Sequence, residues 1–137
     1  MMKILATLLA ATFLLAANLS TEKRKITATV TNVTSDSGKV SFALYDKDSF
    51  MKKPLQAKNG KIENGISTVT FENVTPGNYA IICFHDKNDN NKMDFQANGM
   101  PMEDYGASNN VMTFGPPQYD NSKFQLSDKD IELKIKF

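Results

Sequence analysis

The feature that most constrains the fold is a two-residue alternation of apolar and polar side chains. It recurs in four segments, which read KITATVTNV (25–33), KVSFALYD (39–46), ISTVTFENV (66–74) and KDIELKIKF (129–137). Successive side chains of a strand point to opposite faces, so this period predicts strands with one buried and one exposed face. A fifth segment, YAIICFHD (79–86), is almost continuously apolar and predicts a strand buried on both faces.

The segments between these strands predict turns and one irregular region. SDSG (35–38) predicts a turn that joins 25–33 and 39–46 as a hairpin, and TPGN (75–78) fits a type II turn. Between residues 47 and 65, Pro54 excludes a long helix, and we expect a loop and then a short strand near Leu55 to Ile62. The sequence therefore predicts an all-β domain, an antiparallel two-sheet sandwich of about seven strands.

The N-terminus predicts export. Lys3 is followed by an uncharged, mostly apolar run from Ile4 to Ala17, and polar sequence begins at Asn18. This order is typical of a secretory signal peptide, and the run is short for a membrane span. We expect a signal peptide at 1–20, a single domain at 21–137, and a periplasmic or extracellular location. An uncleaved membrane anchor is the alternative.

Charge and cysteine content limit the partners. The formal net charge is +1, and removing Lys3 with the signal peptide brings it to zero. Nucleic acids and anionic membranes favour basic surfaces, so we expect no nucleic-acid partner and no stable membrane insertion; we expect a monomer. Cys83 is the only cysteine, which excludes an internal disulfide. Its apolar neighbours predict a buried, inert thiol, and a reactive or intermolecular thiol is the alternative.

The segment 86–120 departs from the strand rhythm. It is rich in Asn, Gly and Pro, and a loop of this length in a compact domain tends to be functional or disordered. Disordered segments are poor in large apolar side chains, whereas this one contains several. We therefore expect a long folded loop excursion that packs its own side chains over one end of the sandwich, among them Phe95, Tyr105, Phe114, Tyr119, Met93, Met100, Met102 and Met112.

The start of this excursion predicts a metal site. In HDKNDNNKMD (85–94), five residues occupy positions 1, 3, 5, 7 and 9 of an EF-hand-type calcium loop: Asp86, Asn88, Asn90, Lys92 and Asp94. Lys92 would offer its backbone carbonyl, and a sixth ligand would come from water, Gln96, Asn98 or Glu103. Position 12 is Ala97, which replaces the usual bidentate Glu, so we expect weak Ca²⁺ binding with a Kd of about 10⁻⁴–10⁻³ M.

Three other interpretations of this region stay open. The loop could be a solvated Asn/Asp turn whose side chains cap their own backbone and that needs no ion. Methionines close in sequence to His85 and Cys83 would suit copper, although methionine is also a common gap-filler. Catalysis has little support, because His85 and Asp86 are adjacent on a strand and point to opposite faces, and Ser108 lacks a nucleophile-elbow context. We therefore expect no enzymatic activity.

Three blocks resemble a known family. VTPGNYAIICFHDKNDNNKMD, GMPMEDYGASNN and FGPPQYD are similar, in order and spacing, to the bacterial family known as domain of unknown function 2141. The resemblance runs from about Ile26 to Phe137 and implies an exported sandwich, immunoglobulin-like or prealbumin-like, without implying an activity. Family members usually carry glycine at the positions of Asp89 and Asn91. Asn91 can still adopt the left-handed conformation that glycine allows, whereas Asp89 departs from the family pattern and adds charge.

Taken together, these features predict an exported, non-enzymatic β-sandwich module that binds calcium weakly in the Asp86–Asp94 loop. The alternative is an ion-independent binding or adhesion accessory domain, which would use the 86–120 surface to contact a protein or carbohydrate partner. An exported hydrolase is a third hypothesis.

Overall fold

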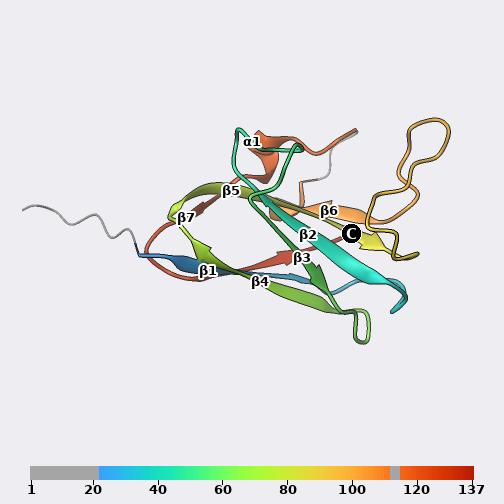
Figure 1. The fold of residues 1–137 in the computed structure, drawn as a ribbon, viewed down its shortest axis with the longest axis horizontal. Helices are drawn as coiled ribbons and strands as arrows, with labels where there is room; N and C mark the ends of the chain where they lie inside the picture. Colours follow the sequence, from blue (N-terminus) through green and yellow to red (C-terminus); the bar gives the residue numbers. More distant parts are fainter. Residues whose placement is uncertain (1–21, 112–114) are drawn as a thin grey trace, which may run out of the picture.

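Two β-sheets face each other in a computed structural model that describes residues 22–111 and 115–137 (Figure 1). One sheet has the order β4 (Ser67–Val74), β1 (Arg24–Val30), β8 (Ile131–Ile135). The other has the order β3 (Gln56–Gly60), β2 (Lys39–Tyr45), β5 (Gly77–Asp86), β6 (Tyr105–Ala107), and β7 (Phe124–Leu126) also pairs with β5. The predicted sandwich is confirmed, with eight strands in the described residues rather than about seven.

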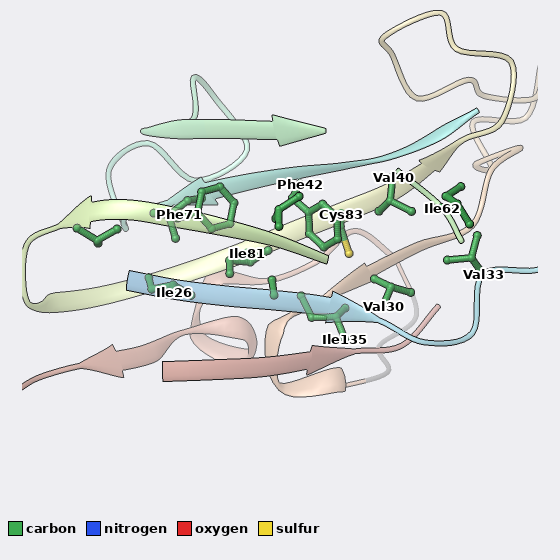
Figure 2. Packing of buried hydrophobic residues seen from close by; sticks show 14 of the residues in the cluster. Ile26, Val30, Val33, Val40, Phe42, Ile62, Phe71, Ile81, Cys83 and Ile135 are labelled. Atoms are coloured by element: carbon green, nitrogen blue, oxygen red, sulfur yellow. The ribbon is translucent and has the colours of Figure 1, made fainter. Parts of the chain in front are cut away.

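The alternating residues build the core between the sheets. Figure 2 shows side chains from both sheets meeting there, including Ile26 and Val30 from β1, Phe42 from β2 and Ile81 from β5. All four are at most 1% exposed. Burying a side chain of this size stabilises the fold by about 1.5–3 kcal/mol. The alternation in the sequence therefore identified the inward-facing residues correctly.

The predicted hairpin between 25–33 and 39–46 is wrong, because β1 and β2 belong to different sheets. The connecting segment crosses from one sheet to the other, and Val33 is buried with its N–H donating to the Gly65 carbonyl oxygen at 3.0 Å. Asp36 accepts the N–H groups of Asn64 and Gly65, which ties the segment to the turn before β4. One further pair differs from the prediction: β1 and β8 are parallel, with Ile26 opposite Ile131.

The described residues of the excursion, 86–111 and 115–120, are folded, and three of them form a strand. β6 pairs with β5, with Phe84 opposite Tyr105, so the chain leaves β5 at Asp86 and returns beside it. A 3₁₀ turn, η1 (Ser108–Asn110), and one helical turn, α1 (Tyr119–Ser122), follow. The Tyr119 ring contacts Phe50 edge-on with ring centroids 5.6 Å apart, which packs this part of the excursion against the loop after β2. The prediction that Phe95, Met100 and Met102 also pack over the sandwich is wrong, because all three are at least 60% exposed. The predicted contributors Met112 and Phe114 lie outside the described residues.

The predicted signal peptide at 1–20 also lies outside the described residues. Within 22–111 and 115–137, no helix is both long and apolar enough to cross a membrane.

The expected short strand near Leu55 to Ile62 is present as β3.

Candidate functional site

The Asp86 carboxylate, at the end of β5, organises the loop that follows it. Asp86 is fully buried. Its Oδ1 accepts the N–H of Asn90 at 3.1 Å, and its Oδ2 accepts the N–H of Asn91 at 2.8 Å. Asp89 and Asn91 have φ angles of 55° and 64°, the left-handed conformation that the family glycines imply. Asp86 therefore holds a tight turn closed through two backbone groups.

Lys39 supplies the positive charge beside this buried carboxylate. Its Nζ lies 3.8 Å from Asp86 Oδ2 and 2.7 Å from Asp89 Oδ1, and it also donates to Asn91 Oδ1. A buried carboxylate is costly unless hydrogen bonds and a counter-charge compensate it, and this arrangement provides both. The sequence did not predict a role for Lys39, because it lies far from Asp86 along the chain and only the strand register brings the two together.

The Asp94 carboxylate accepts hydrogen bonds from two other predicted ligands, Asn88 and Asn90. Asn88 Nδ2 donates to Asp94 Oδ2 at 2.8 Å, and Asn90 Nδ2 lies 2.9 and 3.0 Å from the two carboxylate oxygens. The hydrogen bonds from Asn90 and then Asn88 lower the pKa of Asp94. The structure thus brings Asn88, Asn90 and Asp94 together, while the Asp86 carboxylate is engaged with the backbone. The Lys92 side chain is exposed, as expected for a residue that would offer only its carbonyl.

Glu103, two residues before β6, closes the loop. Its Oε1 accepts the N–H of Asp94 at 3.2 Å, and its Oε2 accepts the N–H of Lys87 at 3.1 Å. Burial, followed by the side chain of Asp94, raises the pKa of Glu103. Glu103 therefore places a second carboxylate next to Asp94. Of the three residues predicted as a sixth ligand, it is the one whose side chain accepts backbone N–H groups of residues 86–94 within the described residues.

The donor set determines which ion would fit. Within the described part of the chain, no three side chains of His, Cys, Asp or Glu gather where they could hold a metal ion. A site here would depend on asparagine and carbonyl oxygens as well, which calcium accepts and transition metals favour less. The donors proposed for copper differ in exposure: Met100 and Met102 are 60% and 64% exposed, whereas the His85 side chain is fully buried.

The residues considered for catalysis have structural partners. His85 Nε2 lies 2.7 Å from the Ser37 carbonyl oxygen, and its backbone N–H donates to Asp104 O. The Ser108 hydroxyl is buried, accepts the N–H of Ile81 and donates to Ser122 O. Cys83 is fully buried in the core as predicted, and burial raises the pKa of its thiol.

Comparison with known proteins gives one match. The family model described as "Uncharacterized protein conserved in bacteria (DUF2141)" matches residues 28–134. No curated protein and no solved structure matches the chain. The matched range includes all the residues of the loop described above and nearly the whole sandwich. The resemblance seen in the sequence is confirmed: the chain belongs to the DUF2141 family of bacterial proteins.

Proposed function

We propose that this protein is an exported, non-enzymatic β-sandwich module that binds calcium weakly in the Asp86–Asp94 loop. The observation that carries the proposal is the position of Asn88 and Asn90, both of which lie within hydrogen-bonding distance of the Asp94 carboxylate. All three carry oxygen atoms of the kind that calcium prefers. Export is supported by the charge and hydropathy order of residues 1–20.

Small rotations of the loop side chains would turn their oxygen atoms toward a calcium ion. An asparagine amide is nearly symmetric in shape, so a rotation of Asn88 or Asn90 replaces its donating nitrogen with its oxygen. Asp94 and Glu103 would then provide two carboxylates, and a divalent cation between like charges relieves their repulsion. Lys92 keeps its role as a carbonyl ligand. Asp86 would act as a ligand only by exchanging a backbone hydrogen bond, so its larger part is to hold the loop in shape.

The proposed affinity is low. Lys39 already lies against Asp86 and Asp89, and a cation entering the loop meets this positive charge. The loop also offers fewer carboxylates than high-affinity calcium sites, which places the expected Kd at about 10⁻⁴–10⁻³ M.

Thermal melting of the purified protein tests the proposal. Calcium at ten times its Kd adds about 1.4 kcal/mol to the free energy of unfolding, which raises Tm by about 3–6 °C in a domain of this size. Asp94→Ala should remove the calcium-dependent shift. Asp128→Ala removes the same charge from an exposed position remote in sequence from the loop and should leave the shift intact. An unchanged wild-type melting curve in millimolar calcium would rule out the calcium function.

A second candidate function rests on a different observation. The segment Phe95–Met102 turns back on itself: the N–H of Gln96 donates to Met100 O, and Phe95 bridges to Pro101. It contains no charged residue, and Phe95, Met100 and Met102 are at least 60% exposed. This tip supports the hypothesis of an ion-independent binding or adhesion domain with a protein partner. Triple replacement of these residues by serine should abolish partner capture in chelator without lowering Tm.

A further inference from the structure

A hollow lies on the outer face of the five-stranded sheet, away from the core. Its volume is about 360 Å³, within the range of about 300–1,000 Å³ that is typical of small-molecule pockets. Inward-facing Ile81, Cys83 and His85 are fully buried, so the intervening residues Ile82 and Phe84 face outward into this hollow.

The strand register explains why the face is hollow. Two neighbouring rows of outward side chains cross β3, β2 and β5. One row is Ala57, Ala43 and Ile82, and the adjacent row is Asn59, Ser41 and Phe84. Two adjacent alanines leave a depression beside the larger residues of the other row. The floor is therefore apolar at its centre, with the Phe84 side chain along one side.

Rigid walls close the hollow at two ends. At one end stand Tyr45 and Pro54, and the Tyr45 ring is fixed by an edge-on contact with Phe50, with centroids 5.7 Å apart. At the other end stands Asn91, whose position is set by Asp86 and Lys39 as described above. Figure 1 shows the loop after β2 and the excursion after β5 rising at different places along this sheet.

The polar groups of the rim are neutral. Ser41 Oγ donates to Asn59 Oδ1 at 3.1 Å, and Asn91 Oδ1 accepts from Lys39. Within the described residues, neither asparagine Nδ2 donates to another protein group, so both remain available to a ligand. No lining residue carries a charge, and Lys39, which donates to the lining residue Asn91, is balanced by Asp86 and Asp89.

The apolar floor and the uncharged polar rim together determine which class of ligand fits the hollow. A charged ligand would find no opposite charge in the hollow. A peptide that adds a strand to β3 is disfavoured, because Gln56 Nε2 donates to Glu72 O and thereby ties the free side of β3 to β4. An aromatic ring beside amide and hydroxyl groups suits a molecule with an apolar C–H face and uncharged hydroxyl groups. We propose that this hollow, lined by Ala43, Phe84, Asn59 and Asn91, binds an uncharged saccharide.

The proposal is tested by titrating isotope-labelled protein with three kinds of probe while side-chain and backbone amide resonances are followed. The probes are neutral trisaccharides (of glucose in α- and β-linkage and of N-acetylglucosamine), an anionic trigalacturonate, and 1-octanol. A neutral trisaccharide should cause saturable shifts at the side-chain amides of Asn59 and Asn91 and at the backbone amide of Ala43. The shifts are expected in chelator as well as in calcium, because no saccharide contact requires the ion.

Two variants locate the site. Ala43→Phe fills the floor from the outer face without entering the core, and it should abolish the shifts while the amide of Ile81 keeps its wild-type resonance. Asn59→Leu removes a rim donor at an exposed position and should weaken binding by about 2- to 10-fold. The matched control is Thr68→Val, which is exposed on the outer face of the other sheet and should change nothing.

Three results would overturn the proposal: no shift at these amides with any neutral saccharide, shifts that persist in Ala43→Phe, or tighter binding of 1-octanol or trigalacturonate at the same amides. Loss of the calcium response alone would leave the saccharide site intact, so the failures of the two proposals are distinguishable.

Discussion

Lys39 and Asp86 stand directly opposite each other in the β2–β5 pairing, and Lys39 Nζ lies 3.8 Å from Asp86 Oδ2. The same ammonium group reaches Asp89 and Asn91 in the loop that follows. The pairing of β2 with β5 therefore fixes the position of Asp86, where the loop begins. The Asp86 carboxylate in turn accepts the backbone N–H groups of Asn90 and Asn91, so the conformation of the loop depends on its attachment to the sheet.

Replacing Asp86 should therefore destabilise the whole fold. In Asp86→Ala the N–H groups of Asn90 and Asn91 and the Lys39 ammonium lose their shared partner. We expect a loss of about 2–4 kcal/mol in the free energy of unfolding, measured by urea denaturation. Asp128→Ala, at an exposed position, should stay within about 0.5 kcal/mol of wild type. Equal stability of the two variants would contradict the role given to Asp86.

Gly38 should be intolerant of a side chain for a related reason. Its φ is +71°, and an added Cβ would lie 2.0 Å from the Asp86 carbonyl oxygen, too close for any contact. Gly99 is a matched control, because its φ is +83° and nothing lies within 4 Å of an added Cβ. Gly99→Ala should cost about 1–2 kcal/mol for the left-handed backbone alone. Gly38→Ala should cost at least about 2 kcal/mol more, read from the shift in urea midpoint.

The thiol of Cys83 should be inert in the native protein. It is fully buried, its Sγ lies 3.7 Å from the Gly106 carbonyl oxygen, and burial raises its pKa. The thiolate is the reactive form, so a thiol reagent at neutral pH should label it slowly until denaturant is added. Rapid labelling of the folded protein would show that β5 opens locally or that the thiol is accessible.

Intact mass tests the predicted signal peptide. Protein recovered from the periplasm or medium should lack Met1 to Ala17, with cleavage between Ala17 and Thr21, because the apolar run has the length and flanks of a cleaved signal. A mass that retains Met1 to Ala17 would favour the membrane-anchor hypothesis. A variant with Leu8 and Leu9 replaced by Arg should remain in the cytoplasm.

The sequence predicted local features well and long-range pairing less well. Alternation identified Val69 and Phe71 as buried and Thr68 as exposed, because side-chain period depends only on the strand itself. It could not identify partners: β1 and β2 were expected to pair, yet the Asp36 contacts route the chain to the other sheet. The candidate sites show the same difference. The spacing of Asn and Asp in the sequence indicated the loop at 86–94. The position of Lys39 and the hollow proposed for a saccharide depend on the register between strands that are distant in sequence, so the sequence did not indicate them.

The pKa values of the two loop carboxylates, Asp94 and Glu103, should be shifted in opposite directions. Hydrogen bonds from Asn90 and Asn88 lower the pKa of Asp94, and burial together with Asp94 raises that of Glu103. Carbon-13 NMR of the carboxyl groups should place Asp94 below and Glu103 above their usual values of about 3.9 and 4.3. Asp94→Asn should bring the Glu103 value down, because it removes the neighbouring negative charge.

These shifts have opposite effects on stability. A lowered pKa means that the stability contributed by Asp94 is present above its unfolded value and is lost as pH falls through its folded value. A raised pKa means that Glu103 favours the folded state once it is protonated, so it destabilises the fold as pH rises through its folded value. Glu103→Gln should therefore remove the loss of stability that Glu103 contributes as pH rises from the usual glutamate pKa of about 4.3 through its raised folded value, read from urea midpoints.

In the calcium hypothesis, protons compete with the ion for Glu103, so the calcium-induced Tm shift should shrink as pH falls through the raised Glu103 pKa. A shift that stays constant down to pH 4 would show that any bound calcium does not use this carboxylate.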